Sequence, residues 1–342
     1  MDAFTAAQTT ELVSRIGTKK ATMRLDKLFI NSFMTGPLLG FGCAIVLSVN
    51  ASPWYQENAP GLIRLWGALL FPIGLVMIVL TGADLFTSNV MFMTTALLHR
   101  RVGIVDLLRN WFVSFFGNLA GSLFSMAIIF GYGNVYSTPG YKNAVFTFAE
   151  EKCVTPEWHH IFLRAIGANW LVCMAVYLSI SSREIVSKII AIWWPTATFV
   201  ALALDHVIAN MFFIPTAIFY GAPGITVSFY IWKSLIPTLL GNIVGGGIMV
   251  ALPYWYLYLF QEETTIEFDT GGMGTAVNEN AGPTSNSHSR RILHGREVHH
   301  SDPALQLPQP GADIRSGVSR ELSEEKYGKK PDGQTNGISN GV

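Results

Sequence analysis

The chain has 342 residues, of which 50% are hydrophobic and only 13% are charged, and its formal net charge at pH 7 is zero. Soluble domains carry about 25% charged residues, so this composition excludes an ordinary soluble protein. The balanced charge gives no sign of nucleic-acid binding, and the three cysteines are too few for a disulfide framework or a metal site. We expect no metal and no cofactor.

The scarcity of charge is confined to one part of the chain. Residues 25–260 contain long uncharged runs, whereas 261–342 is rich in Gly, Ser, Asn, Pro and charges of both signs. The sequence therefore predicts a short N-terminal segment (1–24), a membrane domain (25–260) and a tail (261–342) that lacks the apolar content to order itself.

Six apolar segments are candidates to span a membrane, since a spanning helix needs about 20 residues. In chain order they are Leu28–Val49, Leu65–Leu98, Asp106–Phe130, Ile161–Ile180, a fifth that starts near Ile189, and Tyr230–Leu259. No cleavable signal peptide precedes the first segment, which we expect to act as an uncleaved signal anchor. An even number of spans places both termini on the same side.

Lysine and arginine residues predict which side that is. They gather in the N-terminal segment and in the loops after the second and fourth spans: Arg15, Lys19, Lys20, Arg24, Lys27, Arg100, Arg101, Arg183 and Lys188. Cytoplasmic loops carry such an excess, so both termini are predicted to be cytoplasmic.

Two of the spans are interrupted by residues that are expensive in lipid. Asp84 follows Thr81 and Gly82 in the middle of the second span, and Asp205 and His206 stand side by side in the fifth. A helix break at this depth is tolerated only where it lines protein or water, and it creates a helix N-terminus that favours an anion. Asp is a preferred N-cap, so we expect both carboxylates to cap the new half-helices through backbone amides.

A G-N-x-x-G motif occurs twice, at 117–121 and 241–245. Asp84 lies 34 residues before Asn118 in the first copy, and His206 lies 36 residues before Asn242 in the second. The chain therefore resembles two three-span halves, which are inverted relative to each other because each has an odd number of spans. The alternative is chance recurrence of a small-residue packing motif.

His206 is the strongest functional candidate. Burial favours neutral imidazole and an approaching anion favours imidazolium, so this ring can lend a proton to a weak-acid anion and let it cross an apolar constriction uncharged. The alternative role is a hydrogen bond between helices. The asparagines within the spans also need partners, which can be a loop backbone, another helix or the substrate; they are Asn118, Asn169, Asn210 and Asn242.

Five ordered motifs resemble the formate/nitrite transporter family over roughly residues 20–260. They are G-A-D-L-F-T-S-N at 82–89, G-N-L-A-G at 117–121, A-N-W-L-V-C at 168–173, D-H-V-I-A-N-M-F at 205–212 and L-G-N-I-V-G-G at 240–246. The resemblance implies an all-α membrane protein whose protomer is aquaporin-like. Its six transmembrane helices would form inverted three-helix repeats with helices 2 and 5 broken, in a homopentamer with one pore per protomer.

The resemblance also implies roles for individual residues. His206 would be the central pore residue with Thr87 beside it, and Lys27 would stand near the cytoplasmic entrance. Further polar positions on the pathway would be Asn169, Asn210 and Asn242. The apolar constrictions would be formed by Phe71, Leu75, Leu85, Phe86, Val172 and Phe199. For the basic residue that the family often has near the outer mouth, Lys152 is the nearest candidate, but its loop does not align unambiguously.

The long tail and the extended loop between the third and fourth spans resemble fungal members, which are associated with nitrite uptake at the plasma membrane. We therefore expect a plasma-membrane transporter, not an enzyme, that carries nitrite, or formate as the second choice, and is coupled to protons through His206. Three alternatives stay open: an intramembrane aspartyl enzyme that uses Asp84 and Asp205, a non-transporting scaffold, and a neutral-solute channel.

Overall fold

A computed structural model describes residues 3–262, 264 and 266, and within these residues the protein is all-helical. An isolated bridge between Ala3 and Ser182 is the one strand-like pairing that the described part contains. The predicted tail lies almost wholly outside the described residues.

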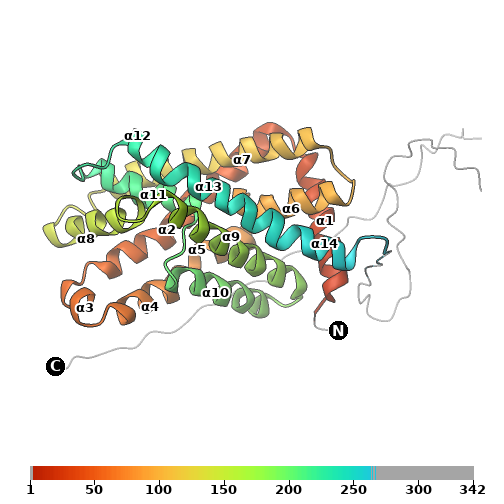
Figure 1. The fold of residues 1–342 in the computed structure, drawn as a ribbon, viewed down its shortest axis with the longest axis horizontal. Helices are drawn as coiled ribbons and strands as arrows, with labels where there is room; N and C mark the ends of the chain where they lie inside the picture. The colour runs from red at the N-terminus through yellow and green to blue at the C-terminus, as the bar shows by residue number, and fades with distance from the viewer. Residues whose placement is uncertain (1–2, 263, 265, 267–342) are drawn as a thin grey trace, which may run out of the picture. The chain divides into compact units, whose positions relative to one another are not determined.

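The helices of the first part of the chain run in the order shown in Figure 1. They are α1 (Ala6–Ala21), α2 (Leu25–Asn50), α3 (Pro53–Asn58), α4 (Pro60–Leu70), α5 (Ile73–Thr81), α6 (Phe86–Leu98), α7 (Ile104–Phe124) and the π-helical η1 (Ser125–Tyr132).

The second part begins with a helical loop and ends with a long, partly π-helical segment. Its elements are α8 (Pro139–Ala149), η2 (Glu150–Val154), α9 (Trp158–Ser181), α10 (Ile185–Ala201), α11 (Val207–Phe219), α12 (Val227–Tyr230), η3 (Ile231–Leu235), α13 (Ile236–Ile243), η4 (Val244–Ala251) and α14 (Leu252–Tyr258).

Five helical segments of the described chain are long and apolar enough to cross a membrane. They are Leu25–Asn50, Pro60–Thr81, Ile104–Tyr132, Trp158–Ser181 and Val227–Tyr258. The region of the fifth predicted span consists instead of two shorter apolar helices, α10 and α11. The second span starts at Pro60 and not at the predicted Leu65, because proline at the first helical position suits a helix start.

Both predicted breaks are present, and each has a distorted backbone. Gly82 ends α5 with φ 75°, a left-handed conformation that glycine adopts without strain. At the second break the left-handed residue is Ala203, with φ 54°, which has a Cβ and is less suited to it. The neighbouring carbonyl contacts described below hold this turn in place.

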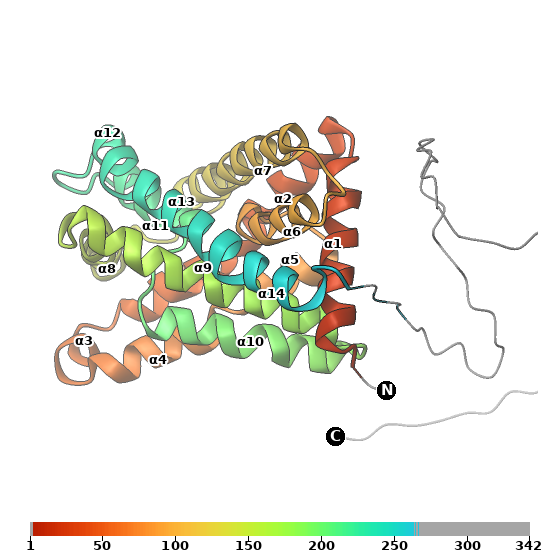
Figure 2. The ribbon, with the colours of Figure 1, turned by 45° about the vertical axis from the view of Figure 1, so that its right-hand side comes forward.

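The N-terminal segment contains a helix that we did not predict. Thr5 and Gln8 form a capping box that starts α1, and α1 packs against α6, α9 and α14 (Figure 2). The α1 side chain Glu11 is buried and accepts a hydrogen bond from Arg101 at 2.7 Å. α1 contains few large apolar residues, and the separation of Glu11 from Arg101 in the sequence gives no sign of this ion pair.

The glycines of the repeated motif allow helices to touch. A Cβ added to Gly121 on α7 would lie 1.9 Å from the carbonyl oxygen of Phe33 on α2, and one on Gly241 of α13 would lie 2.3 Å from that of Phe162 on α9. Close helix packing is the role of these glycines in both copies of the motif. It leaves open what the asparagine in each motif does.

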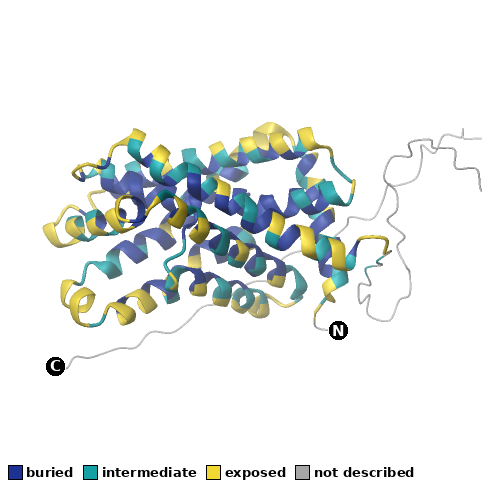
Figure 3. Cartoon of the chain, in the orientation of Figure 1, coloured by how far each residue is buried: buried dark blue, intermediate teal, exposed yellow. Residues whose placement is uncertain are grey.

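Exposed residues lie over the outside of the helical unit (Figure 3), and many of them are large and apolar. Phe112, Trp194 and Trp232 are 65%, 65% and 67% exposed. Soluble monomers rarely expose such contiguous apolar surface, whereas lipid or neighbouring subunits would cover it. Inside the unit, all three cysteines are free and buried.

Candidate functional site

The two helix breaks bring Thr87 and His206 together. Thr87 lies in the first turn of α6, and His206 is the N-cap of α11. The Thr87 hydroxyl is 2.8 Å from Nε2 of His206, and both residues are buried. The predicted neighbourhood of these two residues is thus present, although they are 119 positions apart in sequence.

The second ring nitrogen of His206 fixes the tautomer. Nδ1 accepts a hydrogen bond from the backbone N–H of Ala209 at 3.3 Å. A nitrogen that accepts carries no proton, so the neutral ring holds its proton on Nε2 and donates it to the Thr87 hydroxyl. The ring thereby points its only N–H at the other broken helix.

Asparagines, and not aspartates, support the new helix starts. Oδ1 of Asn118 accepts from the N–H of Phe86 at 2.8 Å, and Oδ1 of Asn242 accepts from the N–H of Val207 at 2.8 Å. Each amide group also donates to a backbone carbonyl at its own break. Asn118 donates to the carbonyl of Asp84 at 2.8 Å, and Asn242 donates to the carbonyl of Asp205 at 3.1 Å. Because breaks within a membrane leave backbone groups without partners, these bonds remove the main cost of the breaks.

The prediction that Asp84 and Asp205 are helix caps is therefore wrong. The N-caps are Leu85 and His206, and the described contacts of the two carboxylates are with side chains. Lys20 forms an ion pair with Asp84, and Lys152 forms one with Asp205 at 3.1 Å. A buried carboxylate needs a cation more than it needs a backbone amide, and each aspartate has found one.

Both carboxylates have further amide donors. Asp84 accepts from Asn31 at 2.8 Å and from Asn89 at 3.3 Å, while Asp205 accepts from Asn210 at 3.4 Å. Each aspartate is bound within its own Lys–Asp–Asn group and not to the other aspartate, which removes the geometric basis of the aspartyl-enzyme alternative. Among the described residues, no group of three or more His, Cys, Asp or Glu side chains could hold a metal ion.

Lys152 is placed differently from a residue that attracts anions. Its Nζ donates to the carbonyls of Ala203 and Leu204 at 2.9 and 3.0 Å and to Asp205 at 3.1 Å. An ammonium group has three donors, so all of them are engaged. Lys152 stabilises the second break, including the left-handed turn at Ala203.

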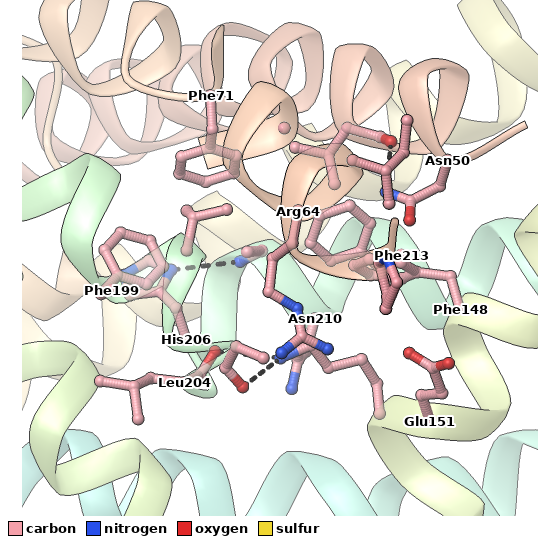
Figure 4. A pocket seen from close by; sticks show the side chains of 18 of the residues that line it. Asn50, Arg64, Phe71, Phe148, Glu151, Phe199, Leu204, His206, Asn210 and Phe213 are labelled. Carbon is pink, nitrogen blue, oxygen red and sulfur yellow. Dashed lines mark hydrogen bonds between the residues drawn. The ribbon is translucent and has the colours of Figure 1, made fainter. Parts of the chain in front are cut away.

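A vestibule lies between these helices and reaches His206 (Figure 4). Its volume is about 190 Å³, and its walls come from the end of α2, from α3 and α4, from α8 and η2, and from the α10–α11 break. Polar side chains line its length, namely Asn50, Gln56, Arg64, Glu151, Lys152, His206 and Asn210. Two of the predicted pathway residues, His206 and Asn210, thus line one cavity.

Two aromatic rings close the inner end of the vestibule. The rings of Phe71 and Phe199 meet edge to face with centroids 5.4 Å apart, and the centroid of Phe199 is 5.9 Å from that of His206. A void of about 10 Å³ adjoins both rings. It is lined by Leu39, Phe71, Leu75, Leu85, Val172, Thr196, Phe199 and His206. This volume holds about one water molecule, so an anion of three heavy atoms passes only if these side chains move.

Five of the six predicted constriction residues line this void, and Phe86 does not. The ring of Phe86 packs against Trp111 and Phe115, at centroid distances of 6.3 and 5.5 Å. Successive residues at a helix start point in different directions, so Leu85 faces the void while Phe86 is turned into the α6–α7 contact. Phe86 is therefore not part of this void, and its place at a constriction stays a prediction.

The remaining predicted residues have other positions. Asn169 donates to the carbonyls of Thr87 and Asn242, at 3.1 and 2.6 Å, and so ties α9 to both halves of the site. Lys27 is exposed in the first turn of α2, and its place at a cytoplasmic entrance stays a prediction.

Lys20, Asn31 and Arg64 are among the residues of the site that the sequence analysis does not identify. Lys20 had been counted only among the positive charges that set orientation, and Asn31 was one polar residue in an apolar run. Arg64 fell outside the predicted second span, which had been placed one residue too late to include it. An unpaired arginine next to an apolar run was the available signal.

Comparison with known proteins identifies the family of this chain. The model of the formate/nitrite transporter family matches residues 7–256. The chain is 38% identical over 266 residues to a probable formate transporter of Methanothermobacter thermautotrophicus, covering 74% of this chain and 96% of the relative. It is 32% identical over 284 residues to the formate channel FocA of Escherichia coli K12, covering 77% and 97%.

A solved structure agrees with the sequence matches. A pentameric formate channel with formate bound has a TM-score of 0.62 and 29% identity to this chain, and the match covers 69% of this chain and 98% of that one. The relatives and structural neighbours are channels and transporters and not enzymes. The protein is a multi-pass membrane protein of the formate/nitrite transporter family.

Proposed function

We propose that the protein carries a small monovalent weak-acid anion across the plasma membrane together with one proton. The observation that carries the proposal is the buried imidazole of His206, which lines both the polar vestibule and the apolar void beyond it. An anion arriving in the vestibule meets a titratable ring at the point where polar lining ends.

Neutralising the anion at this point removes the largest barrier to its passage. The void is lined by apolar groups apart from His206 and Thr196, and burying an isolated carboxylate in such surroundings is very costly. The neutral acid can enter the void without that cost. In the proposed cycle the neutral ring of His206 first takes up a proton from the vestibule as the anion approaches. The imidazolium then gives this proton to the anion and becomes neutral again, and the neutral acid releases the proton on the far side.

Formate and nitrite are the two candidate substrates. The names of the relatives favour formate, whereas the fungal-like tail and loop favour nitrite, which the sequence analysis had put first. Both are small planar anions of weak acids, and the side chains at the constriction do not discriminate between them.

The assembly and orientation are part of the same proposal. Two inverted three-span halves give six spans, and five protomers would cover the exposed apolar faces. The Lys20–Asp84 and Lys152–Asp205 ion pairs, one at each break, support the inverted repeat. The positive charges around α1 support cytoplasmic termini.

The test uses proteoliposomes that contain the purified protein and an internal pH indicator. An inward gradient of formate or nitrite should acidify the interior by one proton per anion and should create no membrane potential. Anion flux with a potential and without acidification would reveal an uncoupled channel. Absence of anion flux would leave the scaffold or neutral-solute alternatives, which water and glycerol flux would separate.

A further inference from the structure

The vestibule contains one cation whose charge is not used within the protein. Three charged side chains line this cavity: Arg64, Glu151 and Lys152. The ammonium of Lys152 is 3.1 Å from the buried carboxylate of Asp205 and donates its other protons to carbonyls. Its charge is balanced and its donors are occupied.

In the described part of the chain Arg64 has neither an ion-pair partner nor a hydrogen-bond partner. Its side chain is exposed, comes from α4, and extends into the vestibule (Figure 4). Within residues 3–262, 264 and 266 no hydrogen bond, ion pair or aromatic contact engages its guanidinium. Glu151 lines the same cavity but forms no ion pair with Arg64 there. All five N–H donors of the guanidinium are therefore available to a solute in the vestibule.

We propose that Arg64 is the anion-capturing residue of the vestibule, where it binds the substrate before the substrate reaches Phe71, Phe199 and His206. A guanidinium presents paired N–H groups in one plane, which matches two oxygens of a planar anion such as formate or nitrite. The inference rests on the proposed transport function and adds the residue that supplies anions to the constriction.

The binding contribution of one partly solvated charge is modest and depends on salt. Replacing Arg64 by an uncharged residue should raise KM for the anion about 3- to 5-fold at low ionic strength. At about 0.5 M salt, where the screening length is a few ångströms, the difference should fall below about 1.5-fold. A structural role for Arg64 would not produce this dependence on salt.

The first test compares Arg64→Gln with Arg64→Lys and with the control Lys142→Gln. Lys142 carries the same charge on α8, does not line the vestibule, and lies 5.5 Å from the centroid of Phe146. With substrate supplied from the vestibule side, KM should rise only in Arg64→Gln and should be mostly restored in Arg64→Lys. Equal KM values for wild type and Arg64→Gln at low salt would overturn the proposal.

A second test changes the sign of the charge at one site. The three native cysteines are buried, so Arg64→Cys introduces an accessible thiol that methanethiosulfonate reagents can label. A cationic reagent should lower KM toward the wild-type value, and an anionic reagent should raise it further. Equal effects of the two reagents would overturn the proposal even if the unlabelled variant is less stable.

Failure of this inference is distinguishable from failure of the proposed function. Wild-type flux with KM values that do not respond to Arg64 would remove only the capture role. Absence of flux in the wild type would remove the transport function itself.

Discussion

Asn118 and Asn242 perform the same task at the two helix breaks. Each accepts the first N–H of a new half-helix at 2.8 Å and donates to a carbonyl of the same break. The N-cap positions that they support differ: Leu85 stands at one and His206 at the other. The two similar breaks thus place one apolar side chain, Leu85, and one titratable side chain, His206, beside the same void. This asymmetry is the basis of the proposed proton transfer.

The hydroxyl of Thr87 should be required for transport. In Thr87→Val the shape is nearly conserved, but the buried Nε2–H of His206 loses its acceptor, a loss that costs about 1–3 kcal/mol. We expect transport to fall at least about tenfold by this reasoning, whereas Thr87→Ser should retain most of it. Initial rates in proteoliposomes, normalised to reconstituted protein, provide the measurement. A fully active Thr87→Val variant would show that the ring needs no orientation by this hydroxyl.

Phe199 should restrict the size of the transported acid. Phe199→Ala removes one of the two rings that meet at the inner end of the vestibule, and the side chain is 3% exposed. We expect faster uptake of larger monocarboxylates such as lactate relative to formate. Leu171→Ala is a matched control because Leu171 packs against the same core without lining the void. Unchanged relative rates in Phe199→Ala would assign this ring to packing alone.

The Lys152–Asp205 pair should be a structural element of the second break. Lys152→Met leaves the buried Asp205 carboxylate without its cation, which typically costs about 3–5 kcal/mol. The thermal unfolding midpoint in detergent should fall clearly. Adding Asp205→Asn to Lys152→Met removes the unpaired charge and should recover part of the loss. If the double variant is as unstable as the single one, the carbonyl contacts of Lys152, and not the ion pair, stabilise the turn.

Much of the architecture could be predicted because lipid restricts the sequence strongly. Apolar length located the spans, and charged residues inside them located both breaks. The partners at the breaks could not be predicted. Aspartate is a good cap in water, but a buried carboxylate binds a cation first, and Lys20 and Lys152 lie 64 and 53 residues away from their aspartates. Pairings over such separations depend on the packed helices.

The orientation of neighbouring side chains also could not be predicted from the sequence. Leu85 and Phe86 are adjacent and equally apolar, yet Leu85 lines the void and Phe86 packs against Trp111 and Phe115. Sequence similarity could identify this segment, but it could not show which of the two side chains points toward the void. Arg64 illustrates the converse case, since a predicted helix start at Leu65 and not at Pro60 left out a side chain that lines the vestibule.

The central claim is that His206 couples the anion to a proton, and substitution of this ring tests it most directly. Uptake of formate and nitrite should be measured at two external pH values for wild type, His206→Asn and the control His160→Asn, whose ring is exposed at the start of α9. We predict that wild type and the control take up anion faster at the lower pH and acidify the interior. His206→Asn should lose most of the flux and all of the acidification. Undiminished uptake by His206→Asn with the same pH dependence would contradict the account.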